Sequence, residues 1–322
     1  MLSLFLFLAN SKATSALAAS AAARNVHSMR TRVFIEDTDA YGIVYFANYA
    51  RWFERAAHSL LGSSQCAHLF RKSGLLLGID SIHAMKFGTA AILGDDITVR
   101  STVLGVDAHE SLHLQIQLVR PADETILITC PRATFSFATR VGEPTPWPAE
   151  RMFPADFDCE IATPTGKLPD LDADSASTST QVLRLQADEC NAHGRISMHA
   201  ALRYFERQRS TALGGPSVLA ALLQSDGVQV VVARMPTVEM FRPAAREVSL
   251  GDVLSVRSTC TLKVRRTQVL FDQWVVCART GRPVAHAEVL CAFVNPMRQR
   301  LVAAPAWLDE QLRELPQVLV YP

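Results

Sequence analysis

The chain contains an internal repeat, which restricts the folds open to it. The six residues Ala50-Arg51-Trp52-Phe53-Glu54-Arg55 return as Leu202-Arg203-Tyr204-Phe205-Glu206-Arg207, 152 positions later (206 − 54). A second match joins Val99-Arg100-Ser101-Thr102 to Val256-Arg257-Ser258-Thr259, 157 positions later (256 − 99), and a Gly-Asp pair precedes both copies. The landmarks keep their order, and the small drift of the offset fits loop insertions after a duplication. The sequence therefore predicts two domains of one fold.

Both halves have the same predicted order of elements, which is a strand, a loop, one helix and several strands. Apolar periodicity in the first half predicts a strand at 31–35, a helix at 43–59 that can end at 62–64, and strands at 81–87, 96–106, 111–119 and 126–138. In the second half it predicts a strand at 181–185, a helix at 197–213, and strands at 228–240, 253–264, 268–278 and 284–294. One helix against a run of antiparallel strands is an α+β layer design.

Composition sets the expected boundaries. Pro, Asp, Ser and Thr are frequent between Glu143 and Thr180, where little periodicity is present. We expect a targeting segment at 1–28, a first domain at 29–142, a linker at 143–180, a second domain at 181–300 and a C-terminal tail at 301–322. A short helix is predicted within the tail, from Pro305 to Leu315.

The first thirty residues differ in composition from the rest. No acidic residue precedes Glu36, while Ala, Ser and a few basic residues dominate, as is typical of a mitochondrial transit peptide. We therefore predict a mitochondrial protein, with a cytoplasmic or a secreted protein as the alternatives. The apolar run 2–9 is shorter than the roughly 20 residues that a bilayer requires, and no other segment qualifies, so stable membrane insertion is not expected.

Charge and cysteine content exclude several classes of function. The formal net charge is +1 and the basic residues form no long runs, so no nucleic-acid partner is expected. The seven cysteines are scattered without a C-x-x-C pair, which argues against a zinc site, and His109 and His113 lack further ligands, so no metal is expected. Motifs of lipases, P-loop nucleotide hydrolases and zinc proteases are not found in the sequence.

The segment from Asp37 to Tyr49 carries a family resemblance. It has the sequence Asp-Thr-Asp-Ala-Tyr-Gly-Ile-Val-Tyr-Phe-Ala-Asn-Tyr and runs into Arg51-Trp52-Phe53-Glu54. This pattern resembles the signature of the 4-hydroxybenzoyl-CoA thioesterase branch of hotdog-fold enzymes, which includes the acyl-CoA thioesterases of the Tol-Pal neighbourhood. Segments of the second half, among them 230–244 and 287–296, look like later strands of that family. The resemblance covers residues 31–138 and 181–296.

The resemblance implies two tandem hotdog domains, each an antiparallel sheet wrapped around one long helix, packed as an internal pseudo-dimer. In single-hotdog relatives two subunits build each site at their interface, so a fused pair would keep one competent and one impaired site. The implied activity is acyl-CoA thioesterase, which hydrolyses a thioester to free acid and CoA. No cofactor is implied beyond the CoA of the substrate, and a dimer of double-hotdog chains is an expected assembly.

Thioester hydrolysis needs a base or nucleophile beside the carbonyl carbon and a donor for the oxyanion. Asp39 lies just ahead of a predicted helix, whose first N–H groups have no partner within the helix. The resemblance implies Asp39 as base or nucleophile and the N–H of Phe46 as oxyanion donor. Around them it implies substrate contacts from Gly42, Tyr45, Asn48 and Tyr49. An alternative stays open in which Asp39 is only a helix cap or turn carboxylate.

The second half has Asn191 at the equivalent position (39 + 152), and an amide cannot act as a carboxylate base. Asn191 and His193 are therefore expected to form a degenerate second site. Plant acyl-ACP thioesterases use an asparagine in their site, so a water-orienting role stays open for both residues. Glu54 and Glu206 recur in both halves and are interpreted as structural contacts. The alternative to an enzyme is a non-catalytic hotdog protein, either a mitochondrial scaffold subunit or an acyl-CoA binding module.

Overall fold

The computed structural model describes residues 26–107, 111–139, 179–241, 245, 247–263, 266–298, 300–308 and 319–320. The first half contains β1 Val26–Arg32, the short 3-10 helix η1 Ile35–Asp37, α2 Asn48–Leu61, α3 Ser63–Ser73, β2 Leu76–Phe87, β3 Asp96–Val106, β4 Leu112–Arg120 and β5 Thr125–Ala138. The second half repeats this order with β6 Ser179–Arg184, η3 Ala187–Glu189, α4 Met198–Ala212, α5 Gly215–Asp226, β7 Gln229–Met240, β8 Val253–Lys263, β9 Gln268–Cys277 and β10 Pro283–Asn295. The predicted duplication is confirmed.

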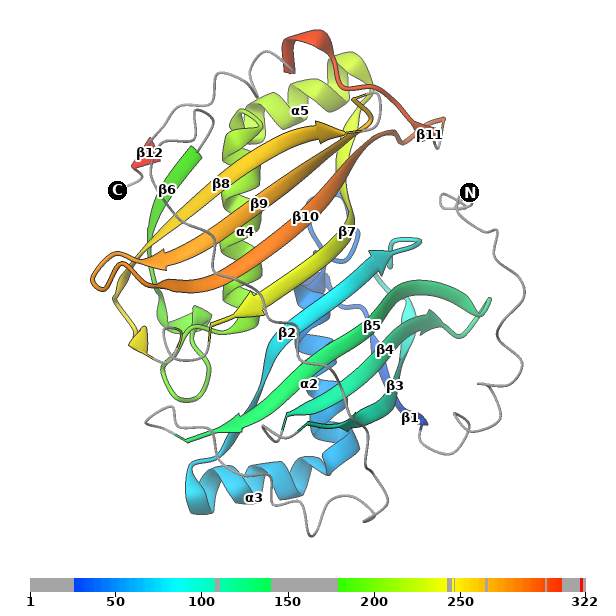
Figure 1. Cartoon of the computed structure of the whole chain (residues 1–322). Coiled ribbons are helices and arrows are strands. Elements are labelled where there is room, and N and C mark those ends of the chain that lie inside the picture. Colours follow the sequence, from blue (N-terminus) through cyan, green and yellow to red (C-terminus); the bar gives the residue numbers. More distant parts are fainter. Residues whose placement is uncertain are drawn as a thin grey trace.

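The strands of both halves form one continuous sheet. Its order is β1-β3-β4-β5-β2-β7-β10-β9-β8-β6-β12, where β12 is Leu319–Val320, so the halves are mirrored about the β2–β7 pair (Figure 1). These two strands are antiparallel, with Ser81 opposite Glu239 and Lys86 opposite Arg234. The side chains of Ile82 and Val238, which face each other across this seam, are buried. The predicted internal pseudo-dimer is therefore present, joined by backbone hydrogen bonds.

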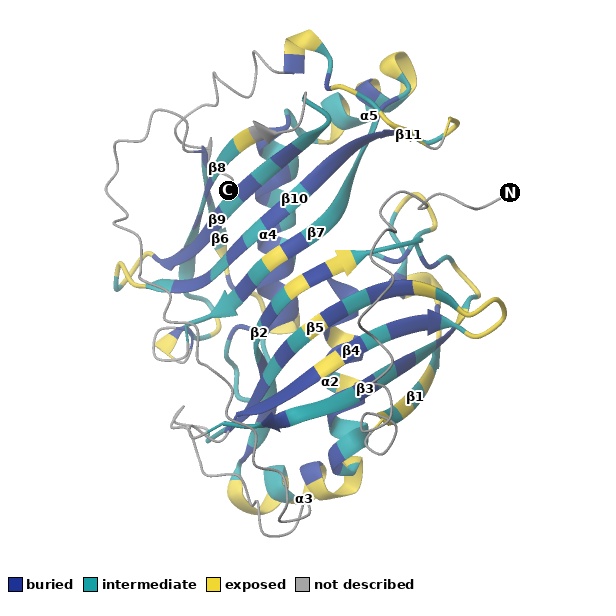
Figure 2. Cartoon of the chain, turned by 45° about the vertical axis from the view of Figure 1, so that its right-hand side comes forward, coloured by how far each residue is buried: buried dark blue, intermediate teal, exposed yellow. Residues whose placement is uncertain are grey.

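Each half wraps its sheet around one long helix, as expected of a hotdog domain. Helices α2 and α4 lie behind the strands in Figure 1 and contact each other. Their repeated aromatic pairs, Trp52-Phe53 and Tyr204-Phe205, are completely buried. Burial also alternates along several strands, with dark and lighter residues in turn (Figure 2). The aromatic repeat thus marks the helix face on which each domain builds its core.

Two helices were not predicted. The sequence predicts that the first helix ends near Gly62, but this glycine, at φ +86°, ends α2 and also begins α3. In the second half Gly214, at φ +98°, similarly precedes α5. The strand predicted at 81–87 is longer in the structure, where β2 begins at Leu76. A positive φ reverses the chain direction without preventing a new helix, so the glycines alone were a poor stop signal.

The structure shifts several predicted boundaries by a few residues. Strand β1 begins at Val26, within the predicted targeting segment, and β6 begins at Ser179, within the predicted linker. Tail residues also join the sheet, since β11 Arg300–Leu301 pairs with β10 and β12 Leu319–Val320 pairs with β6. Of the helix predicted at 305–315, residues 306–308 are helical, residue 305 is not, and 309–315 lie outside the described residues, as do 1–25 and 140–178.

Candidate functional site

Asp39 begins a tight loop ahead of α2. Its N–H donates to the Ile43 carbonyl (2.8 Å), its carbonyl accepts from the Gly42 N–H (3.0 Å), and its Oδ1 accepts from the Tyr41 N–H (2.8 Å). Gly42 has φ +70°, a conformation that glycine adopts without strain. The cap residue of α2 is Ala47, with no side-chain cap, so Asp39 does not cap the helix. Its carboxylate instead accepts backbone N–H groups of its own turn, with the N–H groups of Tyr41 and Ile43 favouring the ionised form.

The start of α2 supplies unpaired backbone donors close to this loop in sequence. No described residue accepts a hydrogen bond from the N–H of Phe46, two positions before the first helical residue. The Phe46 ring is held between the Tyr45 ring (centroids 5.1 Å apart) and the guanidinium of Arg209 (5.1 Å). The predicted oxyanion donor is thus available and its residue is fixed by both domains.

The second domain completes the surroundings of Asp39. The Tyr45 hydroxyl donates to Oε2 of Glu206 on α4 (3.4 Å), across the interface between the domains. The pKa of Asp39 is raised, first because the carboxylate is partly buried and also because Glu206 is a nearby like charge. The site is therefore a loop of one domain facing a helix of the other, as the pseudo-dimer predicts.

Asn48 and Tyr49 lie in the interior. Asn48 Nδ2 donates to the Asp37 carbonyl (3.0 Å) and its Oδ1 lies 3.0 Å from Nε2 of His199 at the start of α4. Tyr49 is buried and packs edge-on against Trp52, with ring centroids 5.3 Å apart. Both residues support the loop and helix around Asp39, and their expected contacts with substrate stay predictions.

Asn191 occupies the same loop geometry in the second domain. Its N–H donates to the Arg195 carbonyl (2.7 Å), its carbonyl accepts from the Gly194 N–H (2.9 Å), and Gly194 has φ +71°. The amide Oδ1 accepts from the N–H groups of His193 (2.9 Å) and Arg195 (3.1 Å). Two donors on one atom fix which end of the amide is oxygen. Asn191 is thus the structural counterpart of Asp39, as the offset predicts.

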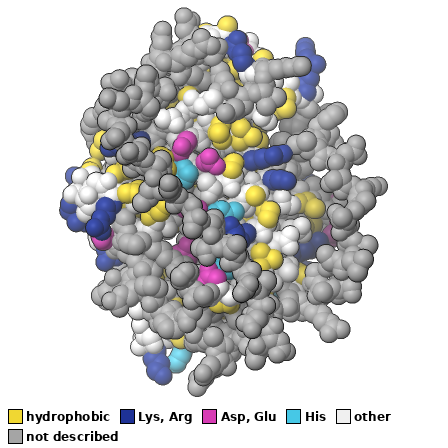
Figure 3. All heavy atoms as spheres, viewed as in Figure 1, with side chains coloured by type: hydrophobic (Ala, Val, Ile, Leu, Met, Phe, Trp, Pro, Cys, Tyr) yellow, Lys and Arg dark blue, Asp and Glu magenta, His cyan; other side chains and the backbone are white. Residues whose placement is uncertain are grey.

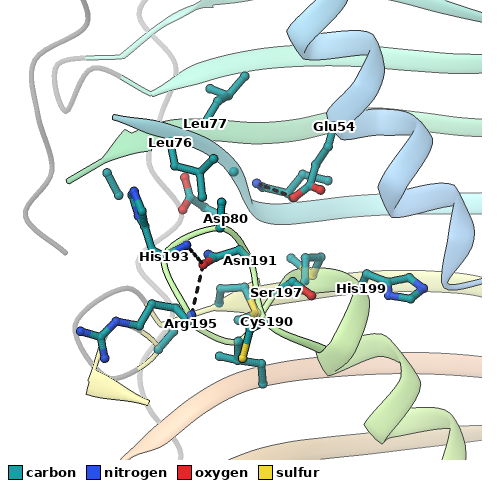
Figure 4. Close-up of a pocket in the computed structure, with 18 of the residues that line it drawn as sticks. Glu54, Leu76, Leu77, Asp80, Cys190, Asn191, His193, Arg195, Ser197 and His199 are labelled. Carbon is teal, nitrogen blue, oxygen red and sulfur yellow. Dashed lines mark hydrogen bonds between the residues drawn. The ribbon is translucent and has the colours of Figure 1, made fainter. Parts of the chain in front are cut away.

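A pocket of about 350 Å³ lies beside the Asn191 loop, between the two domains. Figure 4 shows Asn191 and His193 in this loop, with Leu76, Leu77 and Asp80 of β2 and Glu54 of α2 around it. Residues 197–199, at the start of α4, line the same pocket. The residue pair expected to form a degenerate site therefore lies in a formed cavity, with walls from both domains.

The sequence did not single out Glu54, His58 or His199 as pocket residues. Burial raises the pKa of Glu54 to about 7 and lowers that of His58. Glu54 was interpreted as structural because it recurs in both halves. The recurrence of this glutamate could have indicated a pocket residue. In a twofold arrangement, a residue repeated on both helices lies opposite the loop of the other domain.

The described residues were searched for metal-binding clusters and membrane-spanning helices. Among them there is no group of three or more His, Cys, Asp or Glu side chains that could hold a metal ion. No helix in the described part of the chain combines the length and apolar character needed to cross a bilayer. On the face seen in Figure 3, acidic, basic and histidine side chains are interspersed rather than segregated by charge.

Comparison with known proteins gives one family match in each half. The model of the thioesterase-like superfamily matches residues 33–153 and 185–312. An acyl-CoA thioesterase, YbgC, of Helicobacter pylori (strain ATCC 700392 / 26695) is 36% identical over 81 residues, which is 23% of this chain and 54% of that protein. The chain spans about half the length of the curated relatives it matches.

Two solved structures resemble this chain over most of its length. The 12:0-ACP thioesterase of Umbellularia californica has a TM-score of 0.59 at 12% identity, over 84% of this chain and 94% of that one. An acyl-ACP thioesterase of Bacteroides thetaiotaomicron VPI-5482 has a TM-score of 0.53 at 14% identity, over 84% of this chain and 98% of that one. At these identities the similarity concerns the fold.

Proposed function

The chain belongs to the thioesterase-like superfamily, and from that membership we propose that it hydrolyses an acyl-CoA thioester to a free acid and CoA. The observation that carries the proposal is the Asp39 loop. One oxygen of this carboxylate is tied to the Tyr41 N–H, and the loop leads into the unpaired N–H of Phe46. A carboxylate and a backbone donor beside each other are the two groups that acyl transfer to water requires.

The proposed reaction uses residues of this chain alone. Asp39 acts as the base that takes a proton from water or as the nucleophile that attacks the carbonyl carbon. The N–H of Phe46 binds the oxyanion that forms on the carbonyl oxygen, and the C–S bond breaks. In the base route the water oxygen bonds to the carbonyl carbon and the proton passes to the leaving CoA thiolate. In the nucleophile route an acyl anhydride forms on Asp39, and water then hydrolyses it to the free acid and restores the carboxylate. Gly42 lets the backbone approach the substrate closely, and Tyr45 forms a wall on the side of Glu206. Asn48 and Tyr49 complete the substrate surroundings from the interior.

We propose that hydrolysis with a loop carboxylate as base or nucleophile occurs only at the Asp39 site. Asn191 has the geometry of Asp39, but its amide cannot take a proton from water at neutral pH. The second loop is therefore degenerate for a mechanism that needs a loop carboxylate. We further propose a mitochondrial location, on the composition of the first thirty residues, and a dimer of double-hotdog chains as the assembly.

The first prediction tests Asp39. A protein of residues 25–322, which retains β1 in full, is assayed for free-thiol release from acetyl-CoA, benzoyl-CoA and palmitoyl-CoA. Asp39→Asn should lower kcat by about a hundredfold or more, because the base or nucleophile is lost. The matched change Asn191→Asp should leave the activity of the Asp39 site in place.

Either of two results would contradict the proposal. Undiminished turnover in Asp39→Asn would remove Asp39 from the chemistry. A folded protein that cleaves none of the three thioesters would favour the non-catalytic alternatives, a scaffold subunit or an acyl-CoA binding module. Binding of acyl-CoA without cleavage, measured by calorimetry, would separate these two.

A further inference from the structure

The two repeated glutamates have different surroundings. Glu206 on α4 accepts hydrogen bonds from the hydroxyls of Tyr45 (3.4 Å) and Ser210 (2.9 Å). Its counterpart Glu54 on α2 has one described hydrogen bond, a 3.5 Å contact from the N–H of Ile79. A bond of this length is weak. Glu54 is therefore a partly buried carboxyl group with little hydrogen-bonding support.

Two substitutions between the repeats explain this difference. Ser197 stands at the position of Tyr45 (197 − 45 = 152), and its hydroxyl accepts from the Ala200 N–H and donates to the Glu189 carbonyl. It is thus committed to capping α4. His58 stands at the position of Ser210 (210 − 58 = 152). Glu54 consequently has neither of the hydroxyl donors that hold Glu206.

The loop residue also differs between the two domains, since Asn191 replaces the acceptor Asp39 with a side chain that can donate. Asn191 has its Oδ1 committed to two backbone N–H groups, which leaves the Nδ2 amide hydrogens as the polar group it can present to the pocket. Met198 lines the same pocket at the first position of α4, where the N–H has no partner within the helix. The second pocket thus has two donors at the loop and helix start, where the first site has a carboxylate and a donor.

We propose that the pocket beside Asn191 is a second hydrolytic site, in which Glu54 is the general base. This rests on the proposed function, because its substrate is also an acyl thioester. Asn191 Nδ2 and the Met198 N–H bind the carbonyl oxygen. Glu54 takes a proton from water while the water oxygen bonds to the carbonyl carbon; the C–S bond then breaks, and the proton passes to the leaving thiolate. The products are a carboxylic acid and a thiol.

The ionisation of Glu54 suits this role. Burial is the main cause that raises its pKa to about 7, and the charge of Arg51 acts in the opposite direction. A base titrating near neutral pH combines a populated ionised form with useful basicity. The other ionisable groups around the pocket are Arg51 and His58 on α2, Asp80 on β2, Asp188 and Arg195 beside the loop, and His199 on α4. His193 and Cys190 lie in the loop itself.

The size of the pocket indicates the class of substrate. A volume of about 350 Å³ is near the lower end of the range for small-molecule sites, roughly 300–1,000 Å³. It favours a thioester with a small acyl or aryl group. The chain would then hold two unlike sites, with the free carboxylate on the loop of the first and on the opposing helix of the second.

The second prediction tests Glu54 in a protein that already carries Asp39→Asn. Residual thiol release from acetyl-CoA and benzoyl-CoA should fall by a further factor of about ten or more when Glu54→Gln is added. Glu124→Gln is the matched control, since Glu124 is exposed and pairs with Arg100 at the surface. It should leave the residual rate unchanged.

The pH profile provides a readout that does not depend on folding of the Glu54 variant. In Asp39→Asn, residual kcat/KM should rise with pH and level off above about 7, as the Glu54 carboxyl ionises. A residual rate unaffected by Glu54→Gln, or no residual rate at all, would overturn this inference and leave the Asp39 proposal intact. An inactive wild-type protein would instead overturn the proposed function, and this inference with it.

Discussion

At the residue scale, Asp39 and Asn191 show how one atom separates two chemistries. Both residues have the same backbone hydrogen bonds and the same glycine three positions later. The carboxylate of Asp39 keeps an oxygen that can accept a proton, whereas Asn191 presents amide hydrogens. A duplicated loop can therefore keep its backbone shape while the polar group that it presents changes from a hydrogen-bond acceptor to a donor.

The third prediction concerns Glu206. Burial, and then the negative charge of Glu206, raise the pKa of Asp39. Glu206→Gln removes that charge, so Asp39 should ionise at lower pH and the acid limb of kcat/KM should move down, by less than about one pH unit. The pH–rate profile measures this, with Glu124→Gln as the control. An acid limb that stays in place or moves up would contradict it.

At the scale of elements, the starts of the two long helices are coupled. His199 at the beginning of α4 lies 3.0 Å from Asn48 at the beginning of α2, and both side chains are buried. The side-chain amide of Asn48 in turn donates to the carbonyl of Asp37, two residues before Asp39. The two helix starts therefore position the Asp39 loop together.

The fourth prediction follows from His199. Burial, and then Arg51 and Arg203, lower its pKa from 6.5 to about 4. The unfolded chain therefore binds more protons between pH 6.5 and 4, and this contribution to stability, present above pH 6.5, is lost as pH falls through that window. It is on the order of 2 kcal/mol after allowance for solvent screening.

Urea unfolding at pH 7 and pH 4.5 measures this difference. His199→Gln retains a donor for Asn48 but cannot titrate, so it should lose less stability on acidification than the wild type. The exposed His68→Gln is the control and should follow the wild type. Equal losses in the wild type and His199→Gln would contradict the assignment.

At the scale of the whole molecule, the β2–β7 seam joins the sheets and the cores of the two domains. The buried residues of both halves belong to a single hydrophobic cluster, which includes Ile82, Met85, Met235 and Val238. Neither β2 nor β7 is left as an open sheet edge, which removes a site of edge-to-edge aggregation. The seam also positions each loop against the opposite helix.

The fifth prediction is that the two domains unfold as a single unit, because they share one core and one sheet. Val238 is fully buried at the seam, so Val238→Asp should lower the free energy of unfolding by about 3 kcal/mol or more through an unpaired buried charge. Calorimetry should show one transition at a lower Tm, because both domains depend on the seam. The control Val26→Asp lies on β1, where Val26 is 48% exposed, and should change stability little. Two separate transitions, with one unmoved, would contradict a single unit.

The duplication, the order of elements and the equivalence of Asp39 with Asn191 could be predicted from the sequence alone. Periodicity and repeat spacing are local properties, and local properties are written along the chain. Strands at 96–106 and 126–138 were predicted within one residue of β3 and β5. Helices α3 and α5 were missed, because a glycine that ends one helix can also begin the next.

The pairing of each loop with the opposite helix was decided only by the tertiary structure. Glu206 faces Asp39 and Glu54 shares a pocket with Asn191 because the antiparallel β2–β7 seam relates the domains by a pseudo-twofold. No spacing along the chain encodes that relation, since residues about 150 positions apart meet through packing. The same holds for the pKa of Glu54, which is raised by burial of the carboxyl group between the two domains. The sequence determined which residues carry carboxylates, and the fold determined the surroundings of each carboxylate.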